Sequence, residues 1–412
     1  MRHRRVLVTL LVLGGVLLAA CSSDSKKSAP TTTTAKIECS TWTNPDERAL
    51  TKTLTNDERG IADACLRLNQ VQVLGTHNSY HLQDEPTIFK AIKAFDASLA
   101  QSIEYTHPAL PTQFSREGVR QIELDVFADP DGGRYAKPKL RSLLQKLDTS
   151  LPGMTKPGFK VLHAQDVDYN SNCITFIACL DAVKSWSKAH AHHLPIAILI
   201  EAKDDPTVDP GLGFVVPPPL TTADFDALDA EIRSVFSPAE MITPDDVRGK
   251  HATLEEAVRS GTGWPTLADA RGKVLFLLDQ GDQRDLYLAG HPGLKGRVIF
   301  TNSKPGQPDA AFVEMNDPDG KNLAAIQQLV RDGYIVRTRS DADTVEARAN
   351  DTRTRENAIT SGAQYVSTDY PAPDKAPFPG SYVVTLPGNR AWRCNPVNTG
   401  PACVSAALDT PG

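Results

Sequence analysis

Eight short apolar segments, separated by longer polar or helical stretches, constrain the fold of this chain most strongly. They are residues 71–75, 119–127, 160–164, 195–203, 274–279, 298–302, 335–340 and 365–370. Several are apolar at consecutive positions, as in "IAILI" and "VLFLL", which is typical of strands buried on both faces of a parallel sheet. The stretches between them carry helical patterns, for example at residues 179–192 and 222–236. The alternation predicts one α/β domain over residues 41–390, a (β/α)₈ TIM barrel, regular or distorted.

One strand position is ambiguous. Residues 313–316 compete for a strand near the sixth position, so the strand numbering there stays open. A nucleotide-binding sheet is not favoured, because no Gly-x-Gly-x-x-Gly follows the first strand.

The N-terminus has the pattern of an export signal. Residues 1–5 are basic, residues 6–18 are apolar, and "LLAAC" places small residues before Cys21. "LAAC" resembles a bacterial lipobox, which implies a signal peptide over residues 1–20, a lipid on Cys21 and a polar tether to residue 40. We therefore expect an extracytoplasmic protein, lipid-anchored to the cell membrane through Cys21. Ordinary secretion without Cys21 is the alternative.

The remaining six cysteines can pair in an exported chain. Loop closure favours near neighbours, so we expect Cys173 with Cys179 and Cys394 with Cys403, which leaves Cys39 with Cys65. The second pair would close a C-terminal tail, residues 391–412. A net charge of −6 and a pI near 5.9 argue against nucleic acid as a partner. We expect a monomer.

Polar residues gather where the first four segments end. They are His77, Asn78, Glu123, Asp125, His163, Glu201 and Lys203. In a barrel of parallel strands these ends form the active-site face. Glu123 and Asp125 are two residues apart and point to the same side of their strand, where their charges repel unless a cation lies between them. Oxygen donors without cysteine favour Ca²⁺ or Mg²⁺ over zinc.

Four motifs, "GTHNSY", "ELDV", "VLHA" and "IEAK", occur in this order on consecutive segments and resemble the catalytic X region of phosphoinositide-specific phospholipase C. With "RTRSDAD" and "STDYP", the region from residue 65 to 390 is similar to the calcium-dependent bacterial members. The resemblance implies that His77 and His163 perform acid/base work. It also implies a Ca²⁺ site made by Asn78, Glu123, Asp125 and Glu201.

The expected chemistry is cleavage of an inositol phospholipid to diacylglycerol and inositol (cyclic) phosphate by attack of the adjacent inositol hydroxyl. We assign His163 as general acid, His77 as phosphoryl stabiliser or partner of the base, and Glu123 or Glu201 as the base. The candidates for phosphate or headgroup contacts are Lys203, Arg337 and Arg339. Arg337 and Arg339 alternate on one strand and therefore face the same side.

Two alternatives remain. A glycerophosphodiester phosphodiesterase also uses a barrel, a Glu-x-Asp pair and a divalent ion, but its first strand normally continues His-Arg-Gly and its third shows His-Asp. Here the residues are His77-Asn78-Ser79 and His163-Ala164. A non-catalytic surface lipoprotein that binds inositol lipids would require a lost catalytic residue, and all six motif residues are present.

Overall fold

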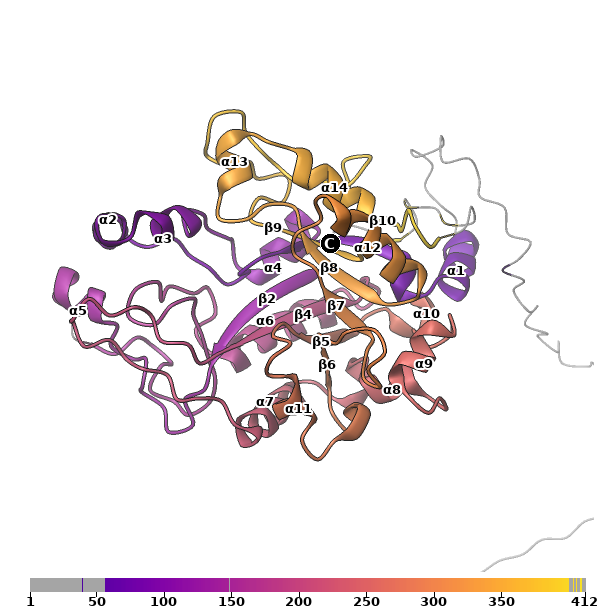
Figure 1. Ribbon diagram of the computed structural model, residues 1–412, viewed down its shortest axis with the longest axis horizontal. Coiled ribbons are helices and arrows are strands. Elements are labelled where there is room, and N and C mark those ends of the chain that lie inside the picture. The colour runs from indigo at the N-terminus through magenta and orange to yellow at the C-terminus, as the bar shows by residue number, and fades with distance from the viewer. Residues whose placement is uncertain are drawn as a thin grey trace, which may run out of the picture. The chain divides into compact units, whose positions relative to one another are not determined.

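Eight parallel strands surround the centre of the fold in a computed structural model that describes residues 39, 56–147, 149–399, 403, 405, 408 and 409 (Figure 1). In spatial order they are β6 (Ile299–Thr301), β5 (Val274–Leu278), β4 (Ile196–Lys203), β2 (Gln121–Phe127), β1 (Val71–Thr76), β9 (Tyr365–Thr368), β8 (Ile335–Arg339) and β7 (Phe312–Glu314). A single parallel bridge between Asn302 and Phe312 joins the end of β6 to β7. The sheet is therefore a nearly closed, TIM-barrel-like barrel, which confirms the predicted fold class.

One of the eight predicted strands, at residues 160–164, is present only as a short strand and is not part of the barrel, and a strand at the ambiguous segment completes the eight. Residues Lys160–Val161 form a short strand, β3, that pairs antiparallel with the end of β2 and lies outside the barrel path. The eighth barrel strand is β7, which overlaps the segment 313–316 that competed for the sixth position. Both segments are short and apolar, and sequence pattern does not distinguish a barrel strand from a strand that only extends one end of a neighbour.

Helices and helical turns occupy the connections between the strands. The helices are α1 (Asn56–Cys65), α2 (Pro86–Phe95), α3 (Ala97–Ser102), α4 (Leu110–Thr112), α5 (Lys139–Gln145), α6 (Phe176–Ala189), α7 (Thr222–Val235), α8 (Pro244–Arg248), α9 (Leu254–Arg259), α10 (Leu267–Ala270), α11 (Arg284–Leu288), α12 (Lys321–Arg331), α13 (Val345–Ala349) and α14 (Arg353–Ser361). The shorter turns are η2 (Leu68–Gln70), η3 (Gln113–Glu117), η4 (Pro238–Glu240) and η5 (Pro292–Leu294). None of the described helices has both the length and the apolar character needed to cross a bilayer.

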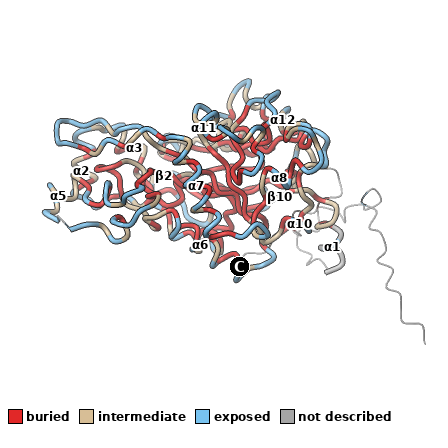
Figure 2. The backbone as a smooth tube through the Cα atoms, turned by 90° about the horizontal axis from the view of Figure 1, so that it is seen from below, coloured by how far each residue is buried: buried red, intermediate tan, exposed pale blue. Residues whose placement is uncertain are grey.

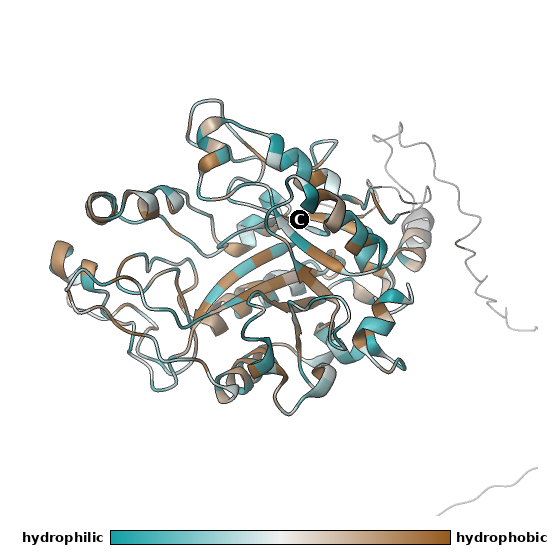
Figure 3. Cartoon of the chain, in the orientation of Figure 1, coloured by the Kyte–Doolittle hydropathy of each residue, from teal (hydrophilic) through white to brown (hydrophobic). Residues whose placement is uncertain are grey.

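The core lies between the strands and the helices that cover them. Figure 2 shows the buried backbone concentrated around the strands, and Figure 3 shows the apolar residues there. Every residue of β2 and β5 is buried, as the apolar sequence of β5 predicts, whereas β2 also buries the polar residues Gln121, Glu123 and Asp125. Gly75 permits β1 and β2 to approach, because a Cβ at this position would lie 1.8 Å from Oε1 of Gln121.

The C-terminal residues contribute to the same fold. Strand β10 (Trp392–Cys394) pairs antiparallel with β1, and the guanidinium of buried Arg120 lies between the rings of Trp186 and Trp392. Three disulfides, Cys39–Cys65, Cys173–Cys179 and Cys394–Cys403, confirm the predicted pairing. The signal peptide, Cys21 and all of the predicted tether except Cys39 lie outside the described residues.

Candidate active site

Three carboxylates converge at the ends of two neighbouring barrel strands. Glu123 and Asp125 lie on β2 and Glu201 lies on β4, where Glu201 is the register partner of Asp125. One oxygen from each side chain lies within 4.8 Å of the others. Glu123 and Asp125 are buried, whereas the Glu201 side chain is 27% exposed. The structure thus brings together three of the four residues predicted to bind metal.

The fourth predicted ligand, Asn78, lies directly after β1 in the left-handed conformation, with φ of 42°. Its two neighbours contact the carboxylate strand: Ser79 N–H donates to the Glu123 carbonyl over 3.0 Å, and His77 Nε2 lies 3.8 Å from Glu123 Oε1. The Oδ1 atoms of Asn78 and Asp125 are both buried without a hydrogen-bond partner among the described residues. Buried acceptors that lack a donor are costly unless a ligand satisfies them, so this set of oxygen atoms fits a hard divalent cation such as Ca²⁺.

Repulsion and burial disfavour charge in this cluster. Burial and the neighbouring Glu201 raise the pKa of Glu123 to about 7, although Arg337 opposes the shift. Burial and Glu201 also raise the pKa of Asp125 well above its ordinary value. A cation among these oxygens would relieve the repulsion.

His77 is oriented by a carboxylate at the end of β9. Its Nδ1 lies 2.9 Å from Asp369 Oδ1, and because a carboxylate only accepts, Nδ1–H is the donor and Nε2 faces Glu123. The Tyr105 hydroxyl lies 3.3 Å from the same Nδ1. Burial, followed by the charges of Arg339 and Arg337, lowers the pKa of His77 well below its ordinary value.

His163 is held by a second carboxylate, Asp168, which it shares with His81. His163 Nδ1 lies 2.9 Å from Asp168 Oδ2, and His81 Nε2 lies 3.0 Å from the same oxygen. His81 is fully buried, whereas the His163 side chain is 22% exposed. Burial, together with the charge of Lys203, lowers the pKa of His163. Burial alone would lower the pKa of His81, but Asp168 outweighs it and raises that pKa.

The three cations predicted to contact substrate occupy different environments. Arg337 is buried, donates to Glu123 and lies 2.6 Å from Glu314 Oε1, so its guanidinium joins two carboxylates inside the barrel. Arg339, at the end of β8, lies 3.5 Å from Asp369 Oδ2. The Lys203 ammonium is 3.0 Å from Asp125.

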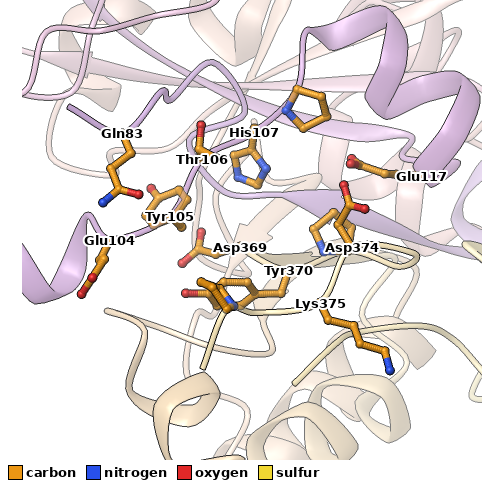
Figure 4. Close-up of a pocket in the computed structure, with 13 residues that line it drawn as sticks. Gln83, Glu104, Tyr105, Thr106, His107, Glu117, Asp369, Tyr370, Asp374 and Lys375 are labelled. Atoms are coloured by element: carbon orange, nitrogen blue, oxygen red, sulfur yellow. The ribbon is translucent and has the colours of Figure 1, made fainter. Parts of the chain in front are cut away.

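A pocket of about 260 Å³ borders this constellation on the side of Asp369 (Figure 4). Tyr105, His107 and Asp369 line one part of it, and Glu117 and Asp374 line another. His107 Nε2 donates to the His77 carbonyl over 3.0 Å. The pocket therefore reaches the residues that position His77.

Sequence reasoning missed the two carboxylates that orient the histidines. Asp369 lies in the quoted "STDYP" motif, and its place at the end of the last strand is a signal that could have identified it. Asp168 lies five residues after His163 in an irregular segment, without a strand or helix period to mark it.

The comparisons with known proteins agree with these observations. The family described as "Phosphoinositide phospholipase C, Ca2+-dependent" matches residues 66–396. Among curated proteins, no sequence matched the chain.

Several solved structures are similar. The calcium-dependent phosphoinositol-specific phospholipase C from Pseudomonas sp. is 18% identical, with 81% of this chain and 96% of that chain covered and a TM-score of 0.48. The Ca²⁺-dependent enzyme from Streptomyces antibioticus is 21% identical, with 74% and 95% covered and a TM-score of 0.43. The enzyme from Listeria monocytogenes is 13% identical, with 74% and 90% covered and a TM-score of 0.40. The family match over residues 66–396 shows that the chain belongs to the Ca²⁺-dependent phosphoinositide phospholipase C family.

Proposed function

We propose that this enzyme cleaves phosphatidylinositol-type lipids in a Ca²⁺-dependent reaction to diacylglycerol and inositol cyclic phosphate, by attack of the adjacent inositol hydroxyl. One observation carries the proposal. His77 and His163 each have Nδ1 committed to a carboxylate, so each leaves Nε2 free to act on a substrate. His77 Nε2 lies 3.8 Å from Glu123 in the carboxylate cluster, and burial and the charge of Lys203, which pairs with Asp125, lower the pKa of His163. Two oriented imidazoles next to an oxygen-rich cation site are what an intramolecular phosphoryl transfer needs.

The cation site is assigned to the buried oxygen cluster. The residues that would hold Ca²⁺ are Asn78, Glu123, Asp125 and Glu201. When bound there, Ca²⁺ lowers the pKa of an adjacent hydroxyl and neutralises charge on a phosphoryl oxygen.

The leaving group is assigned to His163. As the bond between the inositol oxygen and phosphorus forms, the bond between phosphorus and the glycerol oxygen breaks. His163 acts in its imidazolium form: Nε2–H gives its proton to that oxygen, while Asp168 accepts from Nδ1–H and stabilises the positive charge of the ring. The hydrogen bond to Asp168 holds His163 in place although this histidine does not lie on a barrel strand.

Removal of the hydroxyl proton is assigned to His77 with Glu123 beside it, 3.8 Å from Nε2. Lys203, which pairs with Asp125, and Arg339, which lies beside Asp369, contact the phosphate or headgroup. Arg337 has a different role, because its guanidinium already forms ion pairs with Glu123 and Glu314. It holds the Glu123 carboxylate in position.

The test uses phosphatidylinositol with Ca²⁺ or with excess chelator, and phosphorus NMR to identify products. We expect an inositol cyclic phosphate with Ca²⁺ and no turnover in chelator. A lipid whose adjacent hydroxyl is methylated should be inert. Hydrolysis of that blocked lipid at a comparable rate would show that water is the nucleophile and would support the glycerophosphodiesterase alternative.

A further inference from the structure

We propose that α2, residues 137–147 (which include α5) and residues 204–216 form a docking surface that seats the enzyme on an anionic lipid bilayer. This group of segments is called the docking lobe below. The proposal that the docking lobe assists catalysis rests on the proposed function, because a lipid-cleaving enzyme must work at a bilayer. The proposal that the docking lobe binds a bilayer does not rest on that function, and the experiment below tests binding and catalysis separately.

The docking lobe is built from insertions at the active-site face. Its three segments follow β1, β2 and β4, the strands whose ends carry the carboxylates and His77. Figures 1 and 2 both show α2, α3 and α5 together, on the side opposite α1 and α10. One hydrophobic cluster joins the segments, with members Ile88, Ile92, Leu140, Val167, Tyr169 and Phe214.

A hydrogen-bonded aspartate connects the docking lobe to His163. Asp166 Oδ1 accepts from Lys139 N–H at the start of α5 over 2.8 Å, and Oδ2 accepts from Val215 N–H over 2.5 Å. Asp166 lies between His163 and Asp168 in the chain, so the surface and the proposed general acid share one short segment.

The docking lobe exposes most of the large apolar side chains that reach solvent. Seven of the ten exposed large hydrophobic residues in the described part of the chain belong to it. They are Phe95 at 54%, Leu143 at 51%, Leu144 at 38%, Leu147 at 44%, Val208 at 76%, Leu212 at 40% and Val216 at 65% exposed. Figure 3 shows α5 as an apolar helix at the edge of the fold. Exposed apolar side chains gathered in this way mark an interaction surface.

The positive charge of the two helical segments favours an anionic lipid surface as the partner. Residues 86–95 and 137–147 carry six lysines and arginines and no aspartate or glutamate, although the whole chain has a net charge of −6. Lys90, Lys93 and Lys146 are exposed and form no ion pair with the described residues. Leucines flanked by basic residues are typical of elements that lie in a lipid interface, where the apolar side chains insert and the cations meet anionic headgroups.

The third segment, residues 204–216, supplies apolar side chains but also three aspartates and no lysine or arginine, so six basic and three acidic residues leave the docking lobe with a net charge of +3. Asp209 accepts hydrogen bonds from the backbone N–H groups of Gly211, Leu212, Gly213 and Phe214. These hydrogen bonds fold the segment into a tight turn in which Val208 and Leu212 are exposed. The backbone amide dipoles partly compensate the negative charge of the Asp209 carboxylate.

The binding test uses the exported chain carrying Cys21→Ala, which has no acylation site. Cosedimentation is measured in chelator with vesicles of phosphatidylcholine, with or without phosphatidylglycerol and with no inositol lipid, so the active site contributes nothing. We expect Leu143→Ser/Leu147→Ser to weaken binding to both vesicles by about tenfold or more. Lys90→Glu/Lys146→Glu should weaken binding to the anionic vesicles alone by about tenfold or more.

The matched controls change equivalent residues outside the docking lobe. Leu286→Ser removes an exposed leucine on α11, which packs against α7, and Lys250→Glu/Lys295→Glu reverses two exposed lysines. Both should bind as the parent does. Thermal melting verifies that every variant is folded. If the double leucine variant does not fold, Phe95→Ser replaces it in the binding test.

The outcomes are decisive. The proposal is overturned if the parent protein binds neither kind of vesicle. It is also overturned if the leucine variant binds vesicles as strongly as the parent does. A parent dimer that the leucine variant dissociates overturns it too, because the surface would then serve self-association. Activity separates the two claims: the variants should lose turnover of phosphatidylinositol in vesicles and keep turnover of a dispersed short-chain form. Absence of turnover in the parent would refute the proposed function, and the binding result would still stand.

Discussion

Lys203 Nζ lies 3.0 Å from Asp125 Oδ2, so a lysine expected to contact the lipid phosphate forms an ion pair with an expected metal ligand. The same ammonium is 3.6 Å from Glu201 Oε1. Burial alone would lower the pKa of Lys203, but the two carboxylates raise it, so the ammonium stays charged at neutral pH. A positive charge already lies at the edge of the carboxylate cluster.

This contact predicts that Lys203 and Ca²⁺ compete. Lys203→Met removes the cation that repels Ca²⁺, and we expect the dissociation constant for Ca²⁺ to fall by about tenfold. Maximal turnover should fall as well, because a phosphate contact is lost. Calorimetric titration with Ca²⁺ measures the first effect and the steady-state rate measures the second. Unchanged or weaker Ca²⁺ binding would show that the ammonium does not oppose the metal.

Arg337 is predicted to act mainly on stability. Arg337→Met leaves Glu123 and Glu314 buried without their cation, which costs about 3–5 kcal/mol of unfolding free energy. Urea unfolding measures this loss. Arg339→Met is the control, because Arg339 is partly exposed and its ion pair with Asp369 spans 3.5 Å. A raised KM with unchanged stability would instead identify Arg337 as a substrate contact.

Asp168 is predicted to control the leaving-group step through His163. Asp168→Asn removes the carboxylate that orients Nδ1, and we expect diacylglycerol release to slow by about 10²-fold. A substrate with an acidic nitrophenol leaving group needs no proton and should be affected much less, and His163→Ala should show the same discrimination. Equal losses on both substrates would point to a structural role only.

His107 is predicted to make the protein sensitive to acid. Burial lowers the pKa of His107 to about 4, below the ordinary value of 6.5, so between these pH values the unfolded chain binds a proton that the folded chain does not. Stability contributed by the neutral ring is therefore present above pH 6.5 and falls as the pH drops toward 4, by up to ~3 kcal/mol.

The measurement is urea unfolding at several pH values. His107→Gln should flatten the decline, whereas the exposed control His192→Gln should leave it unchanged. A slope that does not respond to His107→Gln would assign the acid sensitivity to other groups.

Cys21 is predicted to anchor the protein. Cys21→Ala in the full chain should move the protein from the membrane fraction to the medium, while the activity per molecule on dispersed short-chain substrate stays the same. Fractionation with labelled fatty acid incorporation tests this directly. Parent protein without label, found in the medium, would support ordinary secretion.

Local patterns in the sequence determined much of the fold. Consecutive apolar residues in β4 and β5 identify buried parallel strands, because both faces of such strands must be covered. The polar residues that end these strands predict which side chains meet, since the carboxyl ends of parallel strands lie on one face. Short spacing predicted two of the cysteine pairs, and Cys39 with Cys65 was the pair that remained.

The tertiary structure decided what depends on contacts between distant segments. The contact of His77 with Asp369 and the pairing of Arg337 with Glu123 join positions far apart in the chain. Asp168 is only five residues from His163, but the irregular segment between them has no helix or strand period that predicts their contact. Whether residues 160–161 or 312–314 complete the barrel depends on which edge remains open after the longer strands pair. A strand's own residues encode its preference for extended backbone and burial, but its neighbours are selected by the packing free energy of the whole chain.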